Sequence, residues 1–202
     1  MNEEQRPTNE NEEPQLTNEQ DHEQHQPRIY VASLSDYNAG RLHGAWINAA
    51  QSAGELHAAI SEMLAASSEP VAEEWAIHDY EGFGALCLEE YENIEHVALL
   101  AQGITEHGPA FAAFANFIGL DGDELLQSFE DSYLGHWEST SAYAEDWLDA
   151  VGLDHILDEA VPPSLRPYVQ VNVEGLARDM EIEGSIHAED ASEGGVYLFQ
   201  PP

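Results

Sequence analysis

The sequence contains no lysine, and only five arginines stand against 40 acidic residues, so the formal net charge over 202 residues is −35. A chain this poor in cations cannot displace the counterions of DNA or RNA, which argues against a nucleic-acid partner. An anionic membrane surface is disfavoured for the same reason. We therefore expect a basic partner: a cation, a basic protein, or a groove built to hold a polyanion. General acidity, as in halophilic proteins, is the alternative that composition leaves open.

Cysteine and long apolar runs are also scarce. Cys87 is the only cysteine, so no internal disulfide can form, and a single thiol is compatible with a reducing cytosol. No run of about 18 apolar residues occurs, and the N-terminus has no apolar signal region, which predicts a soluble protein that is not exported. Hydrophobic residues still make up 43% of the chain, enough to bury a core.

Motifs that carry chemistry are missing as well. The sequence has no phosphate loop, no glycine fingerprint for dinucleotides, no HExxH and no GxSxG. Carboxylate pairs occur throughout, so none stands out as an acid–base couple, and residues 121–124 are too short for an EF-hand loop. His78 and His155 are better explained as structural, and His22 and His25 as tail residues. We expect no catalysis, no cofactor and no metal; metal-assisted hydrolysis on a carboxylate cluster is the least favoured alternative.

The pattern of apolar residues predicts an α+β fold made of three small domains. Residues 1–27 are almost devoid of apolar side chains and are predicted to be a disordered acidic tail. An N-terminal α+β domain is expected at 28–91, a central helical domain at 92–130, and a C-terminal α+β domain at 131–202. The central unit is too short for a core of its own, so we expect it to lean on its neighbours.

Local signals place the elements within these domains. In the first domain, strands are expected at 29–34, 41–47 and 74–80, with a turn at 35–40 and a helix opened by the capping box of Ser52 and Glu55. In the second, helices are expected from Ile94, between Pro109 and Gly119, and after a cap at Asp121. In the third, a strand at 132–137, a helix at 173–182 and a pairing of 186–187 with 196–199 are expected. A further helix, capped by Ser139 or Thr140, is predicted to bury a stripe of Tyr143, Ala144, Trp147, Leu148 and Val151.

The central part of the chain is both acidic and rich in aromatic residues. Residues 42–165 contain no arginine and 24 acids, and the densest run, Asp121–Glu159, also holds several aromatic rings. Such a segment predicts a folded surface that is strongly negative. Acids three or four positions apart on a helix lie about 5–6 Å apart, and one strand of B-DNA presents a charge roughly every 3.4 Å along its axis. Acidic helices can therefore imitate a phosphate backbone.

Ordinary solvated helix faces are the alternative, but they mix both charge signs, and this chain has no lysine. The candidate surface for a partner comprises Glu89, Glu90, Glu92, Glu95, Asp121, Asp123, Glu124, Glu130, Asp131, Glu138, Glu145, Asp146, Asp149, Asp154, Asp158 and Glu159.

Four stretches resemble a known family. Residues 28–48 (RIYVASLSDYNAGRLHGAWIN), 73–83 (EEWAIHDYEGF), 176–186 (LARDMEIEGSI) and 195–199 are similar to the ArdA antirestriction proteins, and the resemblance runs from about Arg28 to Phe199. It does not extend to the N-terminal tail.

This resemblance implies a function and a shape. ArdA proteins are not enzymes; carried on plasmids and transposons, they inhibit Type I restriction-modification enzymes when foreign DNA enters a bacterium. They do so as DNA mimics: elongated, curved, three-domain homodimers whose acidic surface occupies the DNA groove of the methyltransferase core, formed by the specificity and modification subunits. The implied location is the cytoplasm of the bacterial host. An acidic adaptor or chaperone for a basic DNA-binding protein is the alternative.

Overall fold

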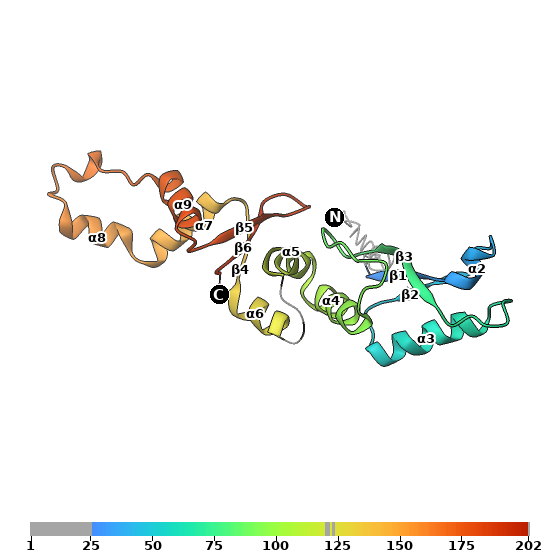
Figure 1. The fold of residues 1–202 in the computed structure, drawn as a ribbon. Coiled ribbons are helices and arrows are strands. Elements are labelled where there is room, and N and C mark those ends of the chain that lie inside the picture. The colour runs from blue at the N-terminus through green and yellow to red at the C-terminus, as the bar shows by residue number, and fades with distance from the viewer. Residues whose placement is uncertain (1–25, 120–121, 123, 202) are drawn as a thin grey trace, which may run out of the picture.

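The computed structural model describes residues 26–119, 122 and 124–201, and shows a mixed α+β fold with two small antiparallel sheets. Figure 1 shows the two sheets apart from one another, with the helices α4, α5 and α6 between them. Most of the predicted tail and the predicted cap at Asp121 lie outside the described residues. Pro27, which the sequence analysis assigned to the tail, is fully buried, and its carbonyl accepts a hydrogen bond from the N–H of Ala49 at 2.9 Å.

The first sheet has the order β2-β1-β3, with both pairs antiparallel. Its strands are β1 (Arg28–Ser33), β2 (Gly44–Asn48) and β3 (Trp75–Glu81). Ile29 and Val31 alternate inward on the central strand and are fully buried, as a half-buried strand requires. The helix α3 (Ala53–Ala65) packs on β1 and β2 through Leu56, Ile60 and Met63. The predicted capping box at its start is present: the Ser52 hydroxyl accepts from Glu55 N–H, and Glu55 accepts from Ser52 N–H.

The predicted turn at 35–40 is wrong in part. The segment begins with the short helix α2 (Leu34–Asn38), which Ser33 caps by accepting a hydrogen bond from the Asp36 N–H at 3.4 Å. Leu34 therefore belongs to this helix and not to the preceding strand, and the second strand begins at Gly44 and not at 41. A single capped turn of helix and a β-turn share the same residue types, so the sequence does not separate them.

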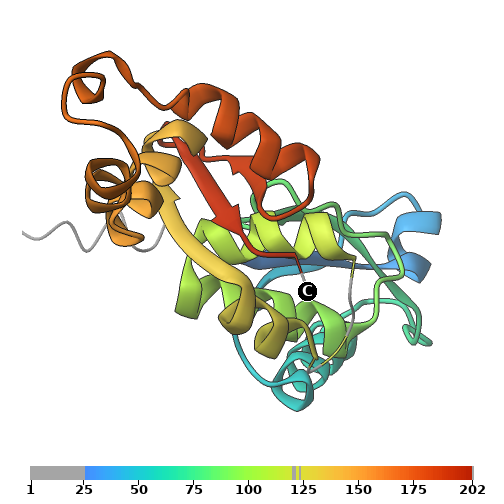
Figure 2. The ribbon, with the colours of Figure 1, turned by 90° about the vertical axis from the view of Figure 1, so that its left-hand side faces the viewer.

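Three helices form the middle of the molecule: α4 (Ile94–His107), α5 (Pro109–Ile118) and α6 (Glu124–Ser132). They bury a cluster of rings around Phe129, whose centroid lies 5.3 Å from Phe111, 5.6 Å from Phe114 and 6.3 Å from Phe199. Figures 1 and 2 show α5 between α4 and the second sheet, where it contacts β6. The hydrophobic core that begins at Ile29 therefore continues through these helices to Phe199. This agrees with the expectation that the central unit is too short to have a core of its own and packs against its neighbours.

The second sheet has the order β4-β6-β5, again antiparallel. Its strands are β4 (Tyr133–Trp137), β5 (His187–Asp190) and β6 (Val196–Phe199). The pairing of residues near 187 with 196–199 is thus confirmed. The remaining elements are α7 (Thr140–Ala150), α8 (Leu153–Ala160), the 3₁₀ turn η1 (Arg166–Tyr168) and α9 (Val173–Ile182).

The predicted buried stripe of α7 is wrong for two of its members. Ala144 and Leu148 are buried, but Trp147 is 40% exposed and Val151 is 44% exposed. The reason is the partner of α7, which is α9, where Gly175 and Ala177 are the buried positions. On α7 only Ala144 and Leu148 are buried and Tyr143 is half-buried, so the covered stripe is narrower than the apolar pattern. Of the residues described, none on α8 is buried.

Candidate functional site: an acidic surface

Thirteen of the sixteen predicted site residues are exposed in the structure. Glu92 is half-buried, and Asp121 and Asp123 lie outside the described residues. The exposed ones are Glu89, Glu90, Glu95, Glu124, Glu130, Asp131, Glu138, Glu145, Asp146, Asp149, Asp154, Asp158 and Glu159. They come from the loop after β3 and from α4, α6, α7 and α8, together with the end of β4, so they form no compact pocket.

Glu92 differs from the others because its carboxylate caps local backbone. It accepts hydrogen bonds from the N–H groups of Glu89 at 3.4 Å and Asn93 at 3.2 Å, just before α4 begins. Because it is half-buried and accepts two backbone hydrogen bonds, Glu92 stabilises the local backbone and is less available to a partner than the exposed acids.

Acidic residues cover more of the molecule than the sequence analysis assigned. Of the 30 acidic residues that the structure describes, 26 are exposed, so half of the exposed acids were not among the predicted set. The additional ones are Glu55, Glu62, Glu73, Glu74, Asp79, Glu81, Glu106, Glu174, Asp179, Glu181, Glu183, Asp190 and Glu193. The absence of lysine from the whole chain indicates that acidic surface is spread along all of it. The high density of acids at 121–159 indicates only that one segment.

Of the four arginines that the structure describes, Arg28, Arg41 and Arg166 are held in ion pairs, and Arg178 of α9 is exposed. Arg28 binds Glu81, with Nη2 2.5 Å and Nε 2.8 Å from Oε2, and its guanidinium lies 4.7 Å from the centre of the Trp46 ring. Arg166 of η1 reaches back to α8, where Nη2 is 2.6 Å from Asp154 Oδ1 and Nε is 2.9 Å from Asp158 Oδ1. Two predicted site residues therefore share one counter-charge.

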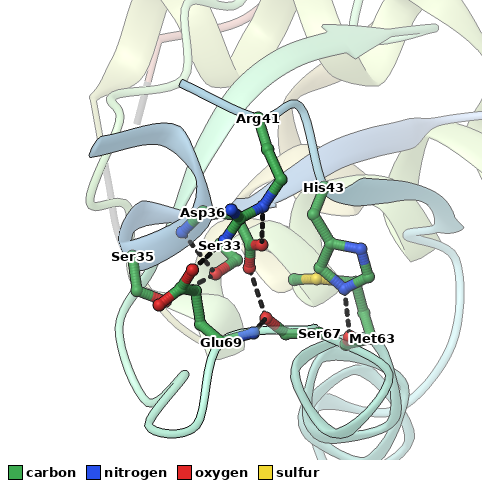
Figure 3. A network of polar contacts seen from close by, with 8 residues as sticks. All are labelled: Ser33, Ser35, Asp36, Arg41, His43, Met63, Ser67 and Glu69. Carbon is green, nitrogen blue, oxygen red and sulfur yellow. Dashed lines mark hydrogen bonds and ion pairs between the residues drawn. The ribbon is translucent and has the colours of Figure 1, made fainter. Parts of the chain in front are cut away.

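Arg41 belongs to a network built around a buried carboxylate (Figure 3). Asp36 is 1% exposed; the Ser67 hydroxyl donates to its Oδ2, and Arg41 Nε lies 3.3 Å from its Oδ1. Arg41 also binds Glu69, whose N–H donates to the Ser67 hydroxyl oxygen at 2.9 Å. Sequence reasoning missed this network because Ser67 stands 31 positions from Asp36, a separation that leaves no local pattern.

Hydrogen bonds set the charge state of Asp36. The hydrogen bond from Ser67 lowers the pKa of Asp36 below its ordinary value, and this effect outweighs burial, which acts the other way. Hydrogen bonds with Ser33 and Arg41 and the charge of His43 lower the pKa further. The carboxylate is therefore ionised at neutral pH. It ties α2 to the segment after α3 and pairs with the partly exposed Arg41.

Three histidines stand beside predicted acids. His57 Nε2 lies 3.8 Å from Glu95, His78 Nε2 lies 3.9 Å from Glu90, and His155 Nε2 lies 3.6 Å from Glu159. At these distances each histidine and its glutamate are neighbours on the protein surface. Across residues 26–119, 122 and 124–201, no group of three or more His, Cys, Asp or Glu side chains is arranged to hold a metal ion. The same ranges contain no helix with the length and hydropathy to span a membrane.

The exposed carboxylates and the ion pairs of Arg28, Arg41 and Arg166 together describe an anionic protein surface. No match was found among curated protein sequences. The family model described as antirestriction protein (ArdA) matches residues 29–193, a range that holds nearly all of the first sheet, the strands β4 and β5 of the second, and the helices from α2 to α9. Since this match spans most of the sequence, the chain belongs to the ArdA family of antirestriction proteins.

Proposed function

We propose that this antirestriction protein imitates B-DNA and occupies the DNA-binding groove of Type I restriction-modification enzymes, formed by their specificity and modification subunits. It blocks restriction and modification of incoming DNA by competition and catalyses no reaction. The observation that carries the proposal is the exposure of 26 of the 30 described acids, while Arg28, Arg41 and Arg166 are held in ion pairs. A groove that binds DNA is lined with cations and would meet almost only carboxylates here.

The charge has the right scale for this role. From Arg28 to Pro202 the sequence holds 32 acids and four arginines, a net charge of −28. At two phosphates per base pair, this equals the charge of about 14 base pairs, or roughly 48 Å of duplex. A symmetric dimer doubles both figures.

The proposed shape is an elongated, curved chain of three domains, divided at 28–91, 92–130 and 131–202. The arrangement in Figure 1 supports this division, because each sheet has its own helices and α4, α5 and α6 stand between the sheets. The first division falls between elements, since β3 ends at Glu81 and α4 begins at Ile94. The second falls in the last turn of α6, two residues before β4 begins at Tyr133. An extended body presents acids along its length, as a duplex presents phosphates.

The proposed assembly is a homodimer. Large apolar side chains are exposed in the C-terminal segment: Ile156 is 50% exposed, Leu165 54% and Tyr168 83%. Together with the exposed Trp147 and Val151, they provide apolar surface that a second copy would cover. A two-fold dimer would also match the pseudo-twofold arrangement of subunits around a split recognition sequence. The proposed place of action is the cytoplasm of a bacterial host, where incoming DNA meets the restriction enzyme.

The decisive experiment is displacement of fluorescently labelled DNA from a Type I methyltransferase by the purified protein. We expect full displacement, for enzymes that recognise different sequences, because a mimic of charge and shape presents no base edges to read. An unrelated basic DNA-binding protein serves as the comparison. If DNA leaves the basic protein as readily as it leaves the methyltransferase, the adaptor or chaperone function is favoured and the proposal fails.

A further inference from the structure

The middle of the molecule contains an open groove of about 540 Å³ along one face of α4. Its floor is apolar, formed by Ala98 and Leu99 of α4, Phe111 of α5 and Leu126 of α6. The volume falls within the range of typical binding pockets, which bury a ligand of modest size against mainly apolar walls. We call this feature the α4 groove.

The floor depends on a glycine. A Cβ on Gly103 would lie 2.3 Å from Cε1 of the Phe111 ring, far closer than atoms can approach. Any other residue at 103 would push this ring away. Gly103 therefore lets the Phe111 ring lie directly against the backbone of α4, where it forms part of the floor.

Both ends of the α4 groove carry a carboxylate. Glu95 and Glu106 line it, and eleven residues of helix separate them by about 16 Å. Gln102 lies between them, exposed, and its side-chain N–H₂ donates to the carbonyl of Gln51 at 2.7 Å. Among the residues that the structure describes, the lining of the groove includes no arginine. The result is an apolar trough with negative charge at each end, as a DNA groove has phosphates along its edges.

We propose that the α4 groove receives an arginine-bearing segment of the partner enzyme's DNA-binding surface, one that would otherwise enter a groove of the DNA. This inference rests on the proposed function and adds a discrete anchor to it. Side chains that read base edges are most often arginines, which combine a planar cation with an apolar stem. The stem packs on the half-buried Leu99 and Leu126, below which the Phe111 ring is fully buried, and the guanidinium binds Glu95 or Glu106. The occupant is identified by charge complementarity: an apolar peptide brings no positive charge to the two carboxylates, and an acidic one is repelled.

Two substitutions that fill the groove test the proposal: Gln102→Arg and Gln102→Trp. Gln127→Arg and Gln127→Trp are matched controls. Gln127 is also an exposed helical glutamine with an acid four residues later, Asp131, to which it donates at 3.0 Å. Gln102→Trp and Gln127→Trp leave the net charge unchanged. Comparing them therefore distinguishes the effect of filling the groove from the effect of a reduced negative charge. Circular dichroism and the melting temperature verify that each variant is folded.

The readout is the concentration that displaces half of the labelled DNA from a Type I methyltransferase. We expect the Gln127 variants to remain within about fivefold of the unmodified protein, as for one exposed charge. The Gln102 variants should require at least about thirtyfold more, as for a buried interface anchor. Equal behaviour of the Gln102 and Gln127 variants, with full displacement by the unmodified protein, would overturn the groove proposal and leave DNA mimicry standing. Absence of displacement by the unmodified protein would overturn the proposed function itself.

Discussion

At the residue scale, the aromatic side chains divide into those that hold the core and those that do not. Phe129 is 3% exposed and lies beside five other rings, among them Tyr133 at 5.1 Å between centroids. Phe129→Ala should therefore lower the free energy of unfolding by about 3–5 kcal/mol. Trp147→Ala, at a position that is 40% exposed, should cost roughly 1 kcal/mol. Urea unfolding followed by circular dichroism measures both. A larger loss for Trp147→Ala than for Phe129→Ala would contradict this division.

The lowered pKa of Asp36 makes part of the stability depend on pH. The folded protein binds the proton of the Asp36 carboxyl less tightly than the unfolded chain does. The contribution of Asp36 to the free energy of unfolding is therefore complete above the ordinary pKa near 3.8, and it is lost as the pH falls through the lowered pKa. Asp36→Asn should thus reduce the melting temperature at pH 7, and the gap to the unmodified protein should narrow on acidification below pH 4. Asp190→Asn, at an exposed acid, is the control for loss of one negative charge. A gap that stays constant between pH 7 and pH 3 would refute the argument.

At the scale of single elements, the start of α3 offers a clean test. Ser52 accepts from the N–H of residue 55 and so satisfies one of the free donors at the helix start. Ser52→Ala should cost about 0.5–2 kcal/mol of stability. Ser61→Ala removes a hydroxyl from the interior of the same helix, where it donates to the carbonyl of His57, and should cost less. Chemical denaturation compares the two, and an equal loss would mean that the cap adds nothing beyond a surface hydroxyl.

Elements with strong local signals could be predicted from the sequence, as α3 and the strand at 29–33 show. The burial of α7 could not, because its apolar stripe is wider than the face that α9 covers. The network of Asp36 escaped prediction for a related reason, since its partners are brought together only by the packing of α2 beside the segment after α3. As for the candidate site, the acids that the structure describes between 124 and 159 are exposed, but charge density along the chain does not show how far an acidic surface extends in space.

At the scale of the whole molecule, the proposed mimicry spreads binding over many charges. Outside the α4 groove, neutralising one exposed acid should weaken DNA displacement by less than about fivefold, because one exposed ion pair contributes little. Glu130→Gln, Glu145→Gln and Asp149→Asn should each behave in this way, and their combination should multiply the losses, since well-separated effects add in free energy. A folded single variant with no remaining activity would instead require a discrete site.

The same spread of charge should make binding depend on salt. Exposed charges are screened over about 10 Å at 0.1 M ionic strength, and over shorter distances at higher salt. We expect the inhibitor concentration needed for half displacement to rise steeply between about 0.05 M and 0.2 M salt, once the salt dependence of the enzyme's own DNA binding has been measured and subtracted. Inhibition that keeps its strength over this range would mean that the acidic surface is incidental.

The loop between β3 and α4 also holds the only thiol of the chain, and Cys87 is exposed. One spin label can therefore be attached without any substitution. In a two-fold dimer the two labels are related by symmetry, so an electron-spin distance measurement should give one sharp separation. That single length would report how far apart the two copies hold their N-terminal sheets, and hence how long a duplex the pair can replace.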